Sequence, residues 1–153
     1  MEFIKLQNRS EFDRDMKSKD RFEGFQQLIT ELEKKGIPAE MVNSINTDIE
    51  LVNSIAGSGS EILKQLKKSQ IRILKMLEKE LKLVTINHYR NMWLAVGISA
   101  FGIPFGVAIG ISLGNLGLLG IGFPIGMGIG WAVGSSMDKK AKESGRQLDV
   151  ELK

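Results

Sequence analysis

Basic side chains recur at helical spacing in the middle of the chain, and their chemistry is the binding of anions. Six of them follow one another at intervals of three or four residues, which places them on one face of a helix. With Lys67 beside them, they are Lys64, Lys68, Arg72, Lys75, Lys79 and Lys82. Two interpretations stay open. The row is either a solvated face paired with acidic N-terminal helices, or a site for single-stranded nucleic acid, another polyanion or anionic lipid.

Other reactive groups are sparse. The chain has no Cys and a single His, His88, which leaves no thiolate for a nucleophile or a metal site. We interpret His88 as an interfacial or helix-packing residue rather than a catalyst. Neither a nucleophile motif nor a phosphate-binding loop accompanies it. The sequence therefore predicts that the protein is not an enzyme and uses no cofactor and no metal.

An uncharged stretch organises the rest of the chain. From Asn91 to Met137 there is no charged side chain and no His, over more than twice the ~20 residues that one membrane-spanning helix needs. Glycine recurs there at every fourth residue in two series. The first is Gly102, Gly106, Gly110 and Gly114, and the second is Gly122, Gly126, Gly130 and Gly134. Such spacing keeps each series on one helix face, where a second backbone can approach closely.

The stretch also contains an internal repeat. The sequence GIPFG at residues 102–106 returns as GFPIG at residues 122–126. Folding the chain at the turn-like sequence GNLG, residues 114–117, brings Pro104 and Pro124 to the same depth. Proline removes a helix hydrogen bond, so each is expected to kink its helix.

We therefore predict a transmembrane helical hairpin with spans at about residues 92–113 and 118–137. A single long re-entrant helix is the main alternative; a β interpretation is disfavoured by the two prolines. Trp93 and Trp131 fall near one interface. Basic residues flank both spans and the turn carries no charge, so both termini are expected in the cytoplasm.

Amphipathic helices are predicted before the hairpin. Apolar residues at three- and four-residue spacing indicate helices at about residues 21–35 and 38–56. A third helix begins at Glu61 and meets no Gly or Pro before Gly97, so we expect it to run as a stalk straight into the first span.

The predicted fold class is therefore all-α, with four parts in chain order. They are a cytoplasmic helical domain at 1–59, a basic stalk helix at 60–91, the transmembrane hairpin at 92–137 and a cytoplasmic tail at 138–153.

The two glycine series resemble those of glycine-zipper membrane proteins, such as mechanosensitive channels and some pore-forming toxins. That resemblance implies homo-oligomeric packing of the zipper helices around a pore. The overall plan is also similar to small membrane effectors of bacterial anti-phage defence, in particular Hailong-type effectors, which implies a channel in a bacterial inner membrane that is controlled by an oligonucleotide. Two function classes stay open: a homo-oligomeric channel gated through its cytoplasmic domain, and a non-conducting membrane anchor or scaffold.

Overall fold

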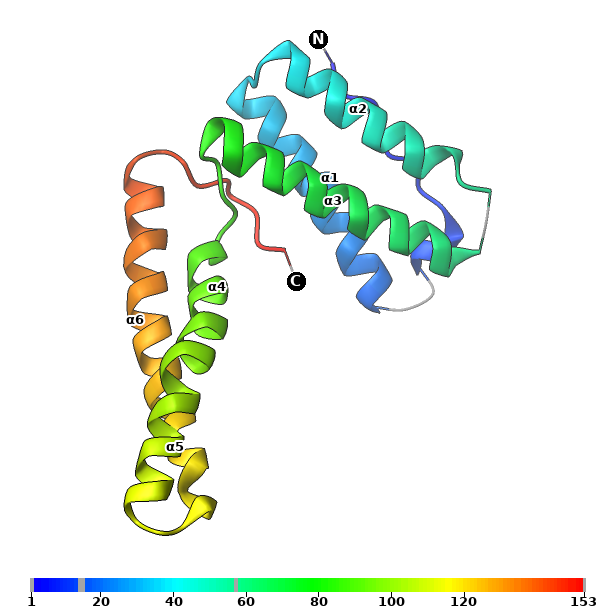
Figure 1. Cartoon of the computed structure of the whole chain (residues 1–153). Helices are drawn as coiled ribbons and strands as arrows, with labels where there is room; N and C mark the ends of the chain where they lie inside the picture. Colours follow the sequence, from blue (N-terminus) through cyan, green and yellow to red (C-terminus); the bar gives the residue numbers. More distant parts are fainter. Residues whose placement is uncertain (1, 14–15, 57, 153) are drawn as a thin grey trace. The chain divides into compact units, whose positions relative to one another are not determined.

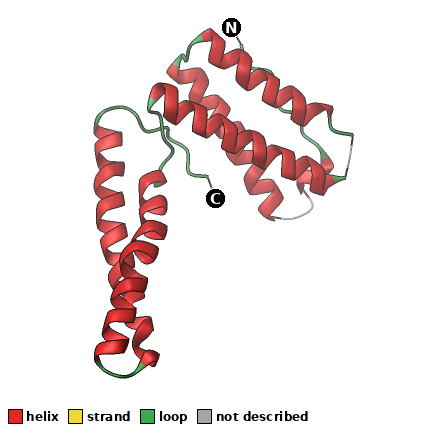
Figure 2. Cartoon of the chain, viewed as in Figure 1, coloured by secondary structure: helices red, strands yellow, loops and turns green. Residues whose placement is uncertain are grey.

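The computed structural model describes residues 2–13, 16–56 and 58–152, and its regular elements are helices (Figures 1 and 2). The predicted all-α class is thereby confirmed for the described part of the chain. The chain divides into two compact units. The first comprises Met1–Thr85 together with Leu148–Lys153, and the second comprises Ile86–Gln147.

Three helices build the first unit: α1 at Met16–Lys35, α2 at Ala39–Ser54 and α3 at Gly59–Leu81. Gly36 ends α1 with a φ of 65°, a left-handed conformation that glycine adopts without a steric penalty. A capping box begins α3, because the Ser58 N–H donates to Glu61 Oε2 at 2.9 Å.

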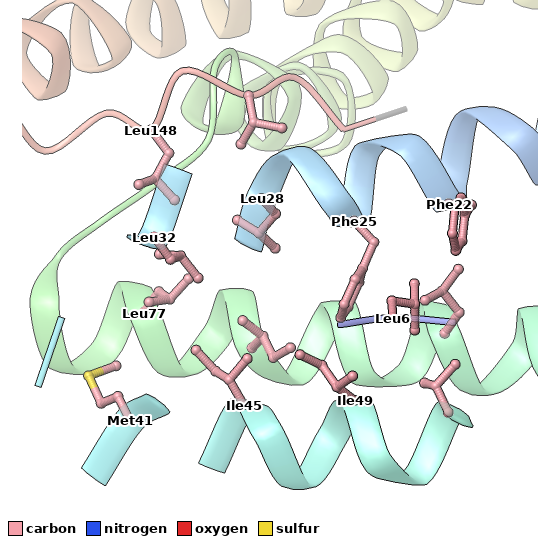
Figure 3. Close-up of a cluster of buried hydrophobic side chains, with 14 of the residues drawn as sticks. Leu6, Phe22, Phe25, Leu28, Leu32, Met41, Ile45, Ile49, Leu77 and Leu148 are labelled. Atoms are coloured by element: carbon pink, nitrogen blue, oxygen red, sulfur yellow. The ribbon is translucent and has the colours of Figure 1, made fainter. Parts of the chain in front are cut away.

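The apolar stripes of these helices meet in one core, which Figure 3 shows in close-up. Side chains from all three helices are fully buried there, among them Phe25, Leu28, Leu32, Ile45, Ile49, Ile73 and Leu77. Burying one such side chain stabilises the fold by about 1.5–3 kcal/mol. The N-terminal segment adds Leu6 and Phe12, and the Phe12 ring stacks on Phe22 with centroids 4.5 Å apart.

The predicted continuous stalk is wrong. Helix α3 ends at Leu81, and six residues separate it from the next helix, α4 at His88–Gly97. Lys82 and Asn87, with φ of 56° and 61°, both adopt the left-handed conformation that interrupts a right-handed helix. Asparagine accepts this conformation more readily than most residues, so the break needs neither Gly nor Pro.

The C-terminal residues, which were expected to form only a cytoplasmic tail, contribute to the core of the first unit. Leu148 and Val150 are buried in the core of the first unit. The Leu148 N–H donates to the Val84 carbonyl at 2.8 Å, which ties the C-terminal segment to the residues that follow α3.

The second unit confirms that the uncharged stretch folds as a helical hairpin. Its first arm comprises α4, a π-helical turn at Ile98–Gly102 and α5 at Ile103–Ser112. Its second arm comprises a 3₁₀ turn at Leu116–Ile121 and α6 at Gly122–Glu143. Gly114 turns the chain between them with a φ of 62°, and Asn115 Oδ1 accepts a hydrogen bond from the Gly117 N–H at 2.9 Å. The two arms lie side by side (Figure 1).

Candidate membrane hairpin and basic helix face

The two arms of the hairpin touch through glycine backbone. A Cβ atom built on Gly126 would lie 2.5 Å from the Gly97 carbonyl oxygen and 2.7 Å from the Gly102 Cα. One built on Gly102 would lie 3.0 Å from the Gly122 carbonyl oxygen. On Gly130 it would lie 3.0 Å from the Leu94 Cα. No other residue type fits such approaches without moving a backbone.

The structure places the eight predicted zipper glycines unequally. All but Gly114 are buried, and six leave no room for a Cβ against the other arm: Gly102, Gly106, Gly122, Gly126, Gly130 and Gly134. Gly110 has an ordinary contact, 3.4 Å from the Asn115 carbonyl oxygen to its built Cβ. Gly114 lies outside the contact, since its built Cβ has no atom within 4 Å and its left-handed φ serves the turn. Six of the eight predicted glycines thus form the contact between the two arms of one chain.

A seventh contact glycine was missed by the sequence pattern. Gly97 is five residues before Gly102, which breaks the four-residue spacing. The π-helical turn at Ile98–Gly102 lies between them. A π turn takes one extra residue per turn, so it absorbs the fifth residue and returns Gly97 to the contact face. Five-residue spacing at the end of a glycine series could have signalled this turn.

The two prolines follow the two irregular turns. Pro104 is the second residue of α5, directly after the π turn, and Pro124 is the third residue of α6, after the 3₁₀ turn. Proline is tolerated in a first helical turn because its missing N–H has no intrahelical partner there. Each predicted kink therefore coincides with a change of helix type: the first arm contains the wider π-helical turn and the second arm contains the tighter 3₁₀ turn.

Large apolar side chains cover the outside of the hairpin. Those at least two-fifths exposed include Met92, Ile103, Phe105, Ile111, Leu113, Leu116, Ile121, Phe123, Ile125, Met127 and Trp131. The two helical stretches His88–Ser112 and Leu116–Glu143 each contain an 18-residue window that is strongly apolar, with mean hydropathies of 2.1 and 1.7, and most residues of these windows are not buried. They are two candidate membrane-spanning helices. A soluble helix pair of this size would bury such side chains rather than its glycines.

A carboxylate closes the open end of the hairpin. Asp138 of α6 accepts the N–H of Tyr89 on Oδ1 and the N–H of Arg90 on Oδ2, both at 3.0 Å. These N–H groups belong to the first turn of α4, where backbone donors lack helical partners. The charge also suits the positive end of the helix dipole. The sequence had indicated Asp138 only as the end of the uncharged stretch.

The basic face of α3 points away from the core. Lys64, Lys67, Lys68, Lys75, Lys79 and Lys82 are all exposed. Within the described residues, Lys79 lies 3.5 Å from Glu80, and the first four lysines form no salt bridge. Most of this face therefore carries unneutralised positive charge.

Arg72 differs from the lysines of the same face. Its Nη1 lies 3.4 Å from Oδ1 of Asp48, a buried carboxylate of α2. Burial raises the pKa of Asp48, while the charge of Arg72 and a hydrogen bond to Ser69 oppose that rise. Arg72 thus stabilises a buried charge on α2 as well as belonging to the basic face.

No family model, curated protein or solved structure matches this chain. The resemblance to glycine-zipper proteins is supported as far as two long apolar helices packed as a hairpin. Any further functional interpretation therefore rests on the sequence and structure of this chain alone.

Proposed function

We propose that this protein is a bacterial inner-membrane protein whose hairpin assembles with further copies into an ion channel, gated through the N-terminal helical unit. One observation supports this most: the hairpin buries glycine between its arms and exposes large apolar side chains around them. In water this arrangement would expose the groups that the hydrophobic effect buries. In a bilayer the same side chains face hydrocarbon, and the backbone hydrogen bonds are satisfied within the helices.

A second set of small residues supports assembly. Each arm carries a row of them two positions from the contact glycines, about 200° around the helix. In the first arm they are Ala95, Ser99, Pro104, Ala108 and Ser112, and in α6 they are Pro124, Gly128, Ala132 and Ser136. All nine are exposed. Small residues let helices of neighbouring hairpins approach closely, and a pore lined by them would be narrow and uncharged.

A pore of this kind would be gated by its apolar lining, because a narrow apolar bore excludes water until it widens. The basic face of α3 is the proposed binding site for a regulatory ligand, since a polyanion such as single-stranded nucleic acid could bind its lysines. An effector role in anti-phage defence is part of this proposal and rests on the resemblance to such effectors alone.

The second candidate function is a non-conducting anchor for the helical unit. The contact glycines are compatible with it, because their close approaches join the two arms of one hairpin. An anchor would need no contact between copies.

Conductance of the purified protein in planar bilayers separates the two functions. A channel gives discrete current steps, and Gly128→Leu, on the outer row, should abolish them together with the oligomer seen by light scattering in detergent. Since a Cβ built on Gly128 meets nothing within 4 Å of its own chain, this variant leaves the hairpin intact. Met127→Leu is the matched control at the neighbouring position. Absence of current from a monodisperse, membrane-inserted wild type would favour the anchor.

A further inference from the structure

Arg72 connects the basic face of α3 to a buried carboxylate. It lies one turn from Lys68 and one turn from Lys75 on that face, and its side chain is 57% exposed. Its Nη1 also lies 3.4 Å from Oδ1 of Asp48, whose side chain on α2 is only 3% exposed. Helices α2 and α3 lie side by side (Figure 1), so one guanidinium serves both the exposed face and the buried group.

An anion that reaches both neighbouring lysines has to pass over Arg72. Lys68 and Lys75 are about 10.5 Å apart along α3, and Arg72 lies between them. A guanidinium binds a carboxylate or a phosphate through the same N–H donors. When Asp48 is ionised, it holds donors of Arg72 and places a negative charge close to the anion, and both effects weaken anion binding. When Asp48 is neutral, both effects disappear.

Asp48 is a carboxyl group that can become neutral inside the fold. Burial raises its pKa above the ordinary 3.8, whereas the charge of Arg72 and a hydrogen bond with Ser69 lower it. Its Oδ2 has no hydrogen-bond partner among the residues that the structure describes. The ionised form therefore depends on Arg72. A bound anion that draws the guanidinium away, or neutralises it, raises the pKa of Asp48 further and favours proton uptake.

Other charged groups lie away from this carboxylate. The residues one turn from Asp48 on α2 carry no charge: they are Ser44, Ile45, Leu51 and Val52. The N-terminal segment, whose charged residues are Glu2, Lys5 and Arg9, binds α2 through Asn46 and Asn53. These asparagines lie about 140–160° around the helix from Asp48. Among the described residues, no charge of α1 acts on the pKa of Asp48. The charge that faces it is that of Arg72, with Lys68 and Lys75 one turn to either side on α3.

We propose that ionised Asp48 competes with the anion for Arg72, so that a polyanion binds the basic face of α3 with uptake of a proton by the Asp48 carboxyl and binds more tightly as the pH falls. At most one proton is taken up from solvent per chain, and Arg72 keeps its own. Asp48 acts on the anion through Arg72 and is a positioning residue. The coupling rests on the proposed anion site of α3 and does not require a channel.

A labelled oligothymidylate tests the coupling, because neither thymine nor a phosphodiester titrates in the mildly acidic range. Its affinity for the full chain in detergent is measured from neutral to acidic pH at fixed salt, with folding checked by circular dichroism. We expect Asp48→Asn to bind about three- to tenfold more tightly than the wild type at neutral pH. The two affinities should converge as the pH falls, because wild-type Asp48 then becomes neutral. Exposed Glu40→Gln also removes one carboxylate and should change the affinity by less than about twofold.

Two double variants ask whether the gain in affinity passes through Arg72. Asp48→Asn combined with Arg72→Gln removes both partners of the pair and should return the neutral-pH affinity to about the wild-type value. Asp48→Asn combined with Lys17→Gln removes the same charge from an exposed position on α1 and should keep most of the gain. Calorimetric titration in buffers of different ionisation enthalpy measures the proton itself. The wild type should take up more protons on binding than Asp48→Asn does, by up to one per chain.

Each outcome of these titrations decides the coupling. Equal affinity and equal proton uptake in the wild type and Asp48→Asn would overturn it and leave the anion site standing. A full gain retained by the variant lacking both Asp48 and Arg72 would exclude competition for Arg72. If neither the wild type nor Asp48→Asn binds the oligothymidylate at any pH, the anion site of α3 fails and the coupling fails with it. No current is measured, so the result holds whether or not the hairpin conducts.

Discussion

The side chain of Asp138 caps a helix to which it does not belong: its Oδ2 accepts the main-chain N–H of Arg90 at 3.0 Å, and its Oδ1 accepts that of Tyr89. The residues are 48 positions apart in the sequence. The bond therefore joins the start of the first arm to the end of the uncharged part of α6. It fixes the register in which the glycine faces meet.

Removing this cap should loosen the hairpin. Asp138→Ala leaves two N–H groups of α4 without a partner and is expected to lower its free energy of unfolding by about 1–3 kcal/mol. Tryptophan fluorescence during denaturation in detergent measures the effect, because both tryptophans of the chain, Trp93 and Trp131, lie in the hairpin. Lys139→Ala, at the exposed neighbouring position, should change stability by less than about 0.5 kcal/mol. Equal stability of the two variants would contradict a capping role for Asp138.

Two glycines of α6, two residues apart, should respond oppositely to alanine. Gly126→Ala places a methyl group 2.7 Å from the Gly102 Cα, so the arms must separate and lose several kcal/mol of packing. Gly128→Ala meets no atom within 4 Å and should be neutral or stabilising by up to about 1 kcal/mol. Unfolding of both variants in detergent, followed by tryptophan fluorescence, makes the comparison. Comparable losses at both positions would mean that the arms do not meet through Gly126.

The all-α class and the hairpin could be predicted because composition and periodicity carry them. The long uncharged stretch predicts apolar helices, and the four-residue glycine spacing predicts a helix face on which they make contact. The break after Leu81 could not be predicted, since Lys82 and Asn87 adopt left-handed conformations that no local residue pattern demanded. The Asp138 cap was out of reach as well, because it depends on the register between two arms rather than on either sequence alone.

The π-helical turn should make one position in the first arm tolerant of deletion. Removing Ala100 from the turn leaves Gly97 and Gly102 four residues apart, as a regular α-helix requires for one face. Removing Val107 from α5 instead rotates the glycines on either side of it by about 100° relative to one another. We expect the hairpin lacking Ala100 to keep a cooperative unfolding transition and the hairpin lacking Val107 to lose it, as measured by tryptophan fluorescence. The reverse order would show that the turn is not a register device.

Stability of the first unit should depend on the ionisation of Asp48. Burial raises its pKa above the ordinary 3.8, so the folded state binds a proton more readily than the unfolded state does. This contribution is present at low pH and is lost as pH rises through the raised pKa. Asp48→Asn should remove that slope and increase stability at neutral pH. Urea unfolding followed by circular dichroism across the acidic range measures it, with exposed Glu40→Gln as the control. An unchanged slope in Asp48→Asn would contradict the assignment.

The basic face of α3 should bind single-stranded nucleic acid in a manner that salt weakens. Lys64, Lys68 and Lys75 are exposed on one helix face and form no salt bridge with another residue that the structure describes, whereas Arg72 pairs with Asp48 and is best left unchanged in a test. Replacing the three lysines with Glu should abolish binding of a labelled oligonucleotide. Wild-type affinity should fall linearly with salt on logarithmic axes, because each phosphate contact releases a counterion.

The control for that charge reversal makes the same change in net charge on a different helix. Lys17, Lys19 and Lys34 of α1 are exposed as well, and replacing them with Glu makes the same change in total charge away from α3. If general attraction to a basic protein were the cause, both triple variants would lose affinity alike. Loss confined to the α3 variant would locate the binding on the basic face. If current through the reconstituted wild type then changed on adding the oligonucleotide, and current through the α3 variant did not, the anion would be acting through this face on the channel. Equal binding by the wild type and both variants would leave the lysines as a solvated surface.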